Sequence, residues 1–309
     1  MRLKRPVIGD EKGFVLIVAL LVTAVLVIVI TEVVQTVQMS VFSVGVKKDS
    51  QRAAILAEGG VELASRAIAE LNKGKNFLYL SKQDAVRSLP VGDGVLTISI
   101  EDEQGKLNPN LIIMANGEVN PEAQAAYERL VKACGYKKAL SDALIDWIDK
   151  DELPRGDGAE GYDYYRGLNP PYDSKNAPLS SADELRLVKG YDDPGAFASV
   201  GGNVTPYTDG RLNINDASSE AIMSLSPDIT QELAQRAVDY RTATPFENTA
   251  DIRKVAGFET IGFAVQGRIT VNSALFRIRT RATVGDAVRE AESVVDITGK
   301  TKVLYWRQR

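Results

Sequence analysis

The chain has 309 residues, of which 44% are hydrophobic and 25% are charged, and its formal net charge is -4. This length allows one large or two modest domains, and the acidic balance argues against a nucleic-acid partner, which would favour a basic face. The chain contains no histidine and a single cysteine, Cys134, which excludes Ser-His and Cys-His catalysis, ordinary zinc sites and an internal disulfide.

The N-terminus joins a short basic leader to a long apolar run. The leader, residues 1–13, ends in Gly13, and the uncharged run of residues 14–31 begins at Phe14. An ordinary secretory signal has its cleavage site after the apolar core, which is then lost. Here the glycine precedes the core, as in the precursors of type IV pilin-like proteins. The sequence therefore predicts processing between Gly13 and Phe14, which leaves the apolar helix on the mature protein.

The apolar run is long enough to cross a membrane, because about 17–25 apolar residues span a bilayer as a helix. Glu32 alone follows the run closely, whereas four basic residues precede it: Arg2, Lys4, Arg5 and Lys12. The positive-inside rule therefore predicts a single span with a cytoplasmic N-terminus and the bulk of the chain outside. A plain membrane anchor is the alternative. A cleaved signal is disfavoured because no small-residue site follows the run at once.

The helix is predicted to continue well beyond the membrane. No proline interrupts residues 14–71, and small and apolar residues recur at spacings of three and four in the second half: Ala53, Ala57, Val61, Ala64, Ile68 and Leu71. This spacing predicts one helical stripe that packs under a globular head. The helix would hold about 58 residues and measure on the order of 87 Å.

Strand signals lie at both ends of the remaining chain. One covers residues 94–102, and three more cover residues 275–284, 287–298 and 302–307, with a tight turn at Gly285-Asp286. The residues between the first strand and the others are mainly helical in pattern. We expect an α+β fold in which a pilin-like N-terminal helix packs on a small antiparallel sheet that carries a large helical insertion.

These signals divide the chain into four parts. The predicted parts are a leader (1–13), the long helix (14–72), a head made of two pieces (73–104 and 266–309) and the inserted domain (105–265). Within the insertion, the segment Gly105-Lys106-Leu107-Asn108-Pro109-Asn110 returns loosely as Gly210-Arg211-Leu212-Asn213-Ile214-Asn215. This echo indicates either a duplication or coincidence.

An acidic segment, residues 146–163, holds seven acids against two bases. Counted from Asp149 as position one, Asp151, Asp157 and Glu160 occupy positions three, nine and twelve, which are ligand positions of an EF-hand calcium loop. Leu153 and Pro154 stand where an EF-hand needs a ligand and a glycine, so the segment is not an EF-hand. The pattern favours a structural calcium site of another shape over a solvated acidic loop, and disfavours a catalytic metal site.

Residues 212–252 resemble a helix-hairpin-helix module, which binds DNA phosphates through glycine-rich hairpin amides at a helix N-terminus. The hairpin here, residues 226–230, lacks glycine. Pro227 offers no N–H, and Asp228 would repel phosphate. The segment is therefore expected to be a helical packing module and not a DNA-binding one.

Taken together, the chain resembles the K-type minor pseudopilins of type II secretion systems. The residues that carry the resemblance are Gly13-Phe14, Asp146-Trp147-Ile148-Asp149 with Asp151, Gly158-Ala159-Glu160, Asn176-Ala177-Pro178-Leu179, Asp183-Glu184-Leu185 with Val188, and Leu212-Asn213-Ile214-Asn215. The resemblance implies cleavage after Gly13 by a prepilin peptidase, methylation at Phe14, bound calcium in the insertion, and a non-enzymatic subunit held in the inner membrane with its bulk in the periplasm. Its implied partners are the I- and J-type minor pseudopilins and the major pseudopilin.

The resemblance also gives Val18 a role. Most pilins carry glutamate five residues into the mature chain, and that glutamate is thought to pair with the terminal amine of a neighbour, because an unpaired charge in the membrane is costly. A subunit with valine suits the end of a filament, so we expect a tip subunit that starts or caps a pseudopilus used to export folded proteins across the outer membrane. The alternatives are a minor pilin of a type IV pilus and a membrane-anchored calcium-dependent hydrolase.

Overall fold

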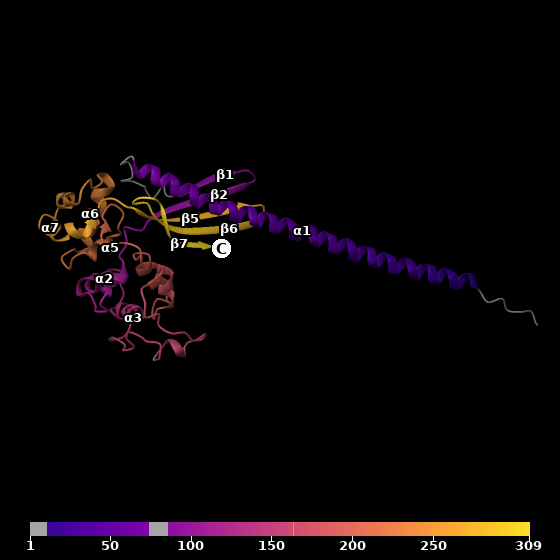
Figure 1. Cartoon of the computed structure of the whole chain (residues 1–309), viewed down its shortest axis with the longest axis horizontal. Coiled ribbons are helices and arrows are strands. Elements are labelled where there is room, and N and C mark those ends of the chain that lie inside the picture. The colour runs from indigo at the N-terminus through magenta and orange to yellow at the C-terminus, as the bar shows by residue number, and fades with distance from the viewer. Residues whose placement is uncertain (1–10, 74–85, 163) are drawn as a thin grey trace, which may run out of the picture.

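The computed structural model describes residues 11–73, 86–162 and 164–309. Most of the predicted leader, with Arg2, Lys4 and Arg5, lies outside the described residues, as does Asp163 of the acidic segment. A long helix leads away from a head and an inserted part that together form the bulk of the molecule (Figure 1).

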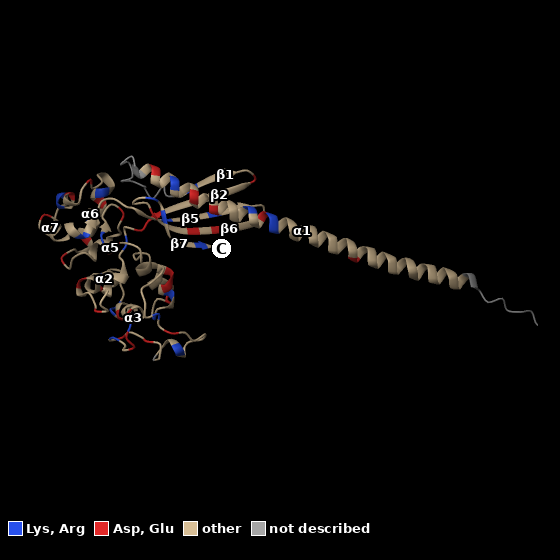
Figure 2. Cartoon of the chain, in the orientation of Figure 1, with Lys and Arg blue, Asp and Glu red and all other residues tan. Residues whose placement is uncertain are grey.

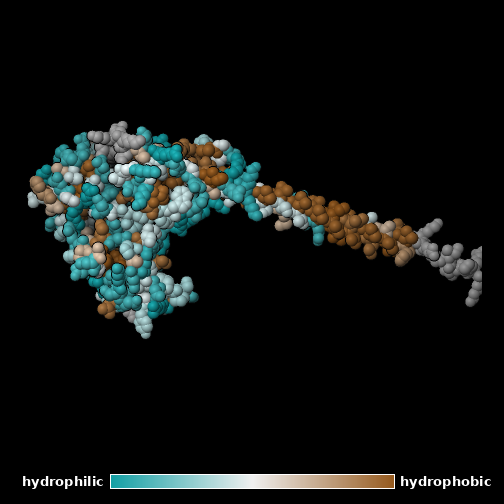
Figure 3. Space-filling model, in the orientation of Figure 1, coloured by the Kyte–Doolittle hydropathy of each residue, from teal (hydrophilic) through white to brown (hydrophobic). Residues whose placement is uncertain are grey.

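Helix α1 (Glu11–Lys73) runs for 63 residues without a break, which confirms the predicted continuous helix. The large apolar side chains of its first half are exposed, from Phe14 to Val46. Figure 3 shows this half as an apolar rod that projects from the bulk of the molecule. By length and composition, α1 is the one helix among the described residues that could cross a membrane.

The second half of α1 packs on a sheet through the predicted stripe. Ala53, Ala57, Val61, Ala64 and Ile68 are buried and form a core with residues from three strands. The prediction was wrong for Leu71, which is 52% exposed because it lies near the end of the helix. Small side chains in the stripe allow close approach, and Thr280 Oγ1 donates a hydrogen bond to Ala57 O at 2.7 Å.

In the described part of the chain, the sheet has five antiparallel strands in the order β1-β2-β5-β6-β7. Its strands are β1 (Val86–Val91), β2 (Gly94–Asp102), β5 (Leu275–Val284), β6 (Ala287–Asp296) and β7 (Lys302–Gln308). Four of them were predicted, and edge strand β1 was not. Strand β6 ends at Asp296 and not at Thr298, because the Asp296 carboxylate accepts hydrogen bonds from the Thr298 N–H and hydroxyl and so turns the chain.

The insertion leaves the sheet after β2 and returns at β5. Its first part contains η1 (Pro109–Ile112), α2 (Pro121–Ala133), α3 (Ala139–Ile148), η2 (Tyr165–Gly167), η3 (Ala182–Leu187), α4 (Pro194–Ala196) and η4 (Phe197–Gly201). Its second part contains β3 (Leu212–Asn213), α5 (Ser219–Met223), α6 (Gln231–Ala243), η5 (Thr249–Lys254), α7 (Ile261–Val265), η6 (Gln266–Arg268) and β4 (Ile269–Thr270). Each part has its own hydrophobic core. The second core includes Val265, Ile269 and Val271, which lie on both sides of the domain boundary drawn at residues 265/266.

The sequence echo at the start of each part folds in the same way twice. Asn108 Oδ1 accepts from the Asn110 N–H, and Asn213 Oδ1 accepts from the Asn215 N–H, each at 3.0 Å. Asn110 then holds both the N–H and the carbonyl of Leu179. Asn215 holds the same two groups of Phe246. Each six-residue copy therefore makes the same set of hydrogen bonds, which connects the start of its part of the insertion to a later segment of that part.

Candidate metal site

Helix α3 positions the first acids of the candidate site. Every residue from Leu140 to Ile148 is buried, and Trp147 packs edge-on against the rings of Tyr165 and Tyr172, with centroids 5.1 and 6.2 Å apart. The helix ends at Ile148, and Asp149 follows as its C-cap in an extended conformation. The packed end of α3 therefore fixes Asp149 at the start of the acidic loop.

The loop brings three of the four predicted ligands together. One carboxylate oxygen from each of Asp149, Asp151 and Glu160 lies within 4.8 Å of the others. Asp149 is 2% exposed and Glu160 is fully buried, whereas Asp151 is exposed. Asp157, the fourth predicted ligand, is exposed and is not part of this cluster.

Arg155 partly neutralises the cluster. Its Nε lies 3.1 Å from Asp149 Oδ2, and its Nη2 lies 4.0 Å from Asp151 Oδ2. The side chain of Arg155 is 40% exposed, so water screens its charge. One arginine beside three carboxylates leaves the site with an excess of negative charge.

Asp146 is a further acid of the site that the sequence-based ligand set omitted. It is fully buried, and its carboxylate accepts the Arg155 N–H at 3.2 and 3.1 Å. A Cβ at Gly158 would overlap Asp146 Oδ2, so only glycine fits there. The signal that could have found Asp146 is its three-residue spacing from Asp149, because Asp146 lies in the last turn of α3 and Asp149 directly follows the helix.

The electrostatics of the described residues favour a bound cation. Burial, followed by the charges of Asp146 and Asp149, raises the pKa of Glu160 to about 7, and burial raises the pKa of Asp149 as well. Ser174 Oγ donates to Glu160 Oε2 at 2.7 Å. Glu160 Oε1 and Asp149 Oδ1 are buried and accept no hydrogen bond from any described residue. Buried carboxylate oxygens without partners are costly, and a hard cation would satisfy them.

The processing and tip-defining residues lie at the other end of the molecule. Gly13, Phe14 and Val18 all belong to the first turns of α1. Phe14 is 70% exposed and Val18 is 43% exposed. The structure therefore places them on the projecting apolar rod, far along α1 from the head (Figure 1).

Comparison with known proteins gives consistent matches. Two family models, both described as type II secretion system protein K, match residues 105–196 and 212–272. The two matches coincide with the two parts of the insertion, and the acidic loop lies in the first.

Several relatives with the same name are similar to this chain along most of their length. The type II secretion system protein K of Aeromonas hydrophila is 28% identical, over 97% of this chain and 96% of its own. Those of Pseudomonas aeruginosa (28% identical, 79% of this chain and 76% of the relative) and Klebsiella pneumoniae (24%, 94% and 94%) are also similar.

A solved structure has the same fold. It is the crystal structure of the GspK-GspI-GspJ complex from the type 2 secretion system of enterotoxigenic Escherichia coli. A chain of that complex superposes with a TM-score of 0.70 at 20% identity, over 85% of this chain and 98% of its own.

Proposed function

The chain belongs to the protein K family of the type II secretion system, and we propose that it is the minor pseudopilin that starts or caps the pseudopilus at its tip. The observation that carries this function is the similarity to the protein K of Aeromonas hydrophila, which covers 97% of the chain. The relatives are named as parts of a secretion system, which supports an assembly role over a hydrolase and over a subunit of a type IV pilus.

Two features support a place at the tip. Val18 cannot pair with the terminal amine of a preceding subunit, so the chain lacks the contact that a subunit inside the filament makes. The insertion broadens the end of the molecule far from the start of α1 (Figure 1). A subunit with this bulk beyond its head is best accommodated where no other subunit has to stack on it.

The apolar rod supports membrane insertion followed by helix packing. Glu32 is the only charged residue between Gly13 and Lys47, and Figure 2 shows this stretch of α1 almost free of charge. The basic residues ahead of this apolar run support an inner-membrane span with its N-terminus in the cytoplasm and with the head and insertion in the periplasm. A prepilin peptidase would cut after Gly13. In the assembled pseudopilus, the exposed rod would pack against the helices of I- and J-type minor pseudopilins and of the major pseudopilin.

We also propose that the acidic loop binds calcium. Asp149, Asp151 and Glu160 would hold the ion, because they offer hard oxygen ligands of which two belong to buried side chains. The ion would neutralise the excess charge that Arg155 leaves and would hold residues 149–160 against the end of α3. This role is structural, because the ion fixes a loop and no reaction is assigned to it.

The function is tested by complementation. In a host strain that lacks this chain, the full-length protein should restore export of secreted proteins and should co-purify with the I- and J-type minor pseudopilins after crosslinking. A strain whose export is unaffected by the deletion, but whose type IV pili are lost, would support the minor pilin alternative instead.

A further inference from the structure

The insertion is joined to the sheet by polar contacts and not by a shared hydrophobic core. Among the described residues, the core between α1 and the sheet has none in common with the two cores of the insertion. By contrast, Leu107 packs against both insertion cores and so links them to each other. Interfaces within a chain that are not large and hydrophobic permit relative motion of the parts. What sets the orientation of the insertion must therefore be polar.

A buried ionic cluster lies where the chain leaves the sheet. Glu103, the first residue after β2, is fully buried. Arg277 on β5 approaches it with two nitrogens, Nε to Oε1 at 2.7 Å and Nη2 to Oε2 at 3.2 Å. Arg277 Nη1 also reaches Glu292 on β6 at 2.6 Å. The two-point contact fixes direction as well as distance, since a guanidinium and a carboxylate pair in one plane.

The same carboxylate holds the insertion. Thr205 Oγ1, from the end of the first part of the insertion, donates a hydrogen bond to Glu103 Oε2, and Lys106 Nζ lies 2.9 Å from Glu103 Oε1. Burial alone would raise the pKa of Glu103, but Lys106 and Arg277 outweigh it and lower this pKa to about 2. Glu103 therefore stays ionised at neutral pH, and its two oxygens connect the sheet to the insertion.

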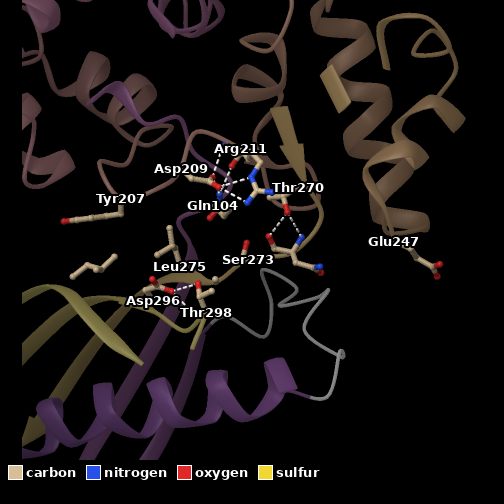
Figure 4. A pocket seen from close by; sticks show the side chains of 13 residues that line it. Gln104, Tyr207, Asp209, Arg211, Glu247, Thr270, Ser273, Leu275, Asp296 and Thr298 are labelled. Carbon is tan, nitrogen blue, oxygen red and sulfur yellow. Dashed lines mark hydrogen bonds and ion pairs between the residues drawn. The ribbon is translucent and has the colours of Figure 1, made fainter. Parts of the chain in front are cut away.

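Beside this cluster, the head and the insertion do not fill the space between them. A cavity of about 830 Å³ opens there, lined from the insertion by Tyr207, Asp209 and Arg211 and from the head by Leu275 and Asp296 (Figure 4). Farther out, one exposed ion pair joins Arg307 of β7 to Asp183 of η3 at 2.8 Å. Exposed pairs contribute little in water, so this contact cannot by itself hold the insertion in place.

We propose that Glu103 and Arg277 are positioning residues that hold the insertion at one orientation on the sheet. Without their ion pair, the insertion swings about the two connecting segments, residues 103–107 and 271–274, into the space that the cavity leaves. A buried ion pair is weak evidence for stability, because its desolvation offsets its attraction, and replacing both partners with neutral groups can be nearly neutral for stability. Orientation and stability are therefore separable here.

The test measures the distance between the head and the insertion in the full-length protein in detergent micelles. Spin labels are attached in a Cys134→Ser background at Ser88→Cys on exposed strand β1 and at Lys137→Cys on the exposed loop after α2. The parent should give one narrow distance distribution by double electron–electron resonance. The double variant Glu103→Gln/Arg277→Gln should give a shifted and broader distribution with a melting temperature close to the parent's.

Two further variants complete the experiment. Arg281→Gln/Glu290→Gln removes an exposed pair of the same sheet, 3.4 Å apart, and should leave the distribution narrow. Glu103→Gln alone keeps the shape of the side chain and serves if the double variant does not fold; it too should broaden the distribution. A narrow, unshifted distribution in the variants that remove the Glu103 charge, whatever their melting temperature, would overturn the proposal.

Discussion

Gly158 lies so close to its neighbours that no side chain fits at this position. A Cβ at this position would overlap Asp146 Oδ2 and would lie 2.8 Å from the Arg155 carbonyl oxygen. Gly158→Ala should therefore lower the free energy of unfolding by about 1–3 kcal/mol, as overpacking of a filled site does. Thermal melts of the full-length protein in detergent measure this. Gly167→Ala is the control, because a Cβ there meets nothing within 4 Å; equal losses in both variants would contradict the explanation.

The four predicted ligands can be separated by one series of melts. Calcium at about a hundred times its dissociation constant should add roughly 2.7 kcal/mol to the stability of the folded chain. Asp149→Asn, Asp151→Asn and Glu160→Gln should each abolish most of this gain when calcium is compared with a chelator. Asp157→Asn is the matched control and should keep it, because Asp157 is not part of the cluster. A chain with no calcium-dependent shift and no metal by elemental analysis would leave the acidic loop as a solvated loop.

Sequence reasoning reached the acidic cluster but not its geometry. The EF-hand count selected Asp149, Asp151 and Glu160, which the fold brings together, and also Asp157, which it does not. Spacing alone predicts neither this difference nor the close contact of Gly158 with Asp146, which joins residues of two segments. Burial of Asp146 depends likewise on the packing of α3, which only the folded chain defines.

At the scale of elements, the packing of α1 on the sheet requires glycine at only one of two adjacent glycine positions. A Cβ at Gly60 would lie 2.9 Å from Leu96 Cδ1 and 3.1 Å from Thr280 Cγ2, whereas one at Gly59 meets nothing within 4 Å. Gly60→Val should therefore cost about 1–3 kcal/mol by forcing the helix off the strands.

The neighbouring position supplies the control for this prediction. Gly59→Ala should leave the stability unchanged or raise it by up to about 1 kcal/mol, because alanine is the better helix former. Both variants are compared by thermal melting with the parent protein. A Gly60→Val protein as stable as the parent would show that the contact between α1 and the sheet is loose.

The elements that sequence reasoning found and missed differ in how much they bury. In strands β2, β5 and β6, apolar side chains that pack against α1 alternate with more polar ones, so their patterns were visible. Strand β1 reads Val-Arg-Ser-Leu-Pro-Val and is exposed throughout. An exposed edge strand needs no apolar alternation, and its proline argues against a strand assignment. The pairing with β2 that makes β1 a strand is tertiary information.

At the scale of the whole molecule, the replacement of glutamate by valine at Val18 is the feature on which the tip assignment depends. Val18→Glu would place a carboxylate in the membrane with no preceding subunit to pair with it, at a cost of several kcal/mol. Export of secreted proteins by the complemented strain should fall, while the head and insertion stay folded by circular dichroism. Val22→Glu places a carboxylate one helical turn farther along the same rod. Comparing the loss of export in the two variants separates the effect of the position of Val18 from the effect of any charge in the membrane. Export at the parent's level would remove the argument from Val18.

The two connections of the insertion begin and end side by side, because Asp102 at the end of β2 is paired with Phe276 near the start of β5. Strands β2 and β5 are neighbours in the sheet, so without the insertion they would form a simple hairpin. A force applied along α1 would reach the sheet through the contacts of α1 with β2, β5 and β6, and it would not pass through the inserted residues. The insertion therefore lies outside the route along which such a force is transmitted. Its loops and helices can differ in sequence, or engage other molecules, without weakening the contact between α1 and the sheet.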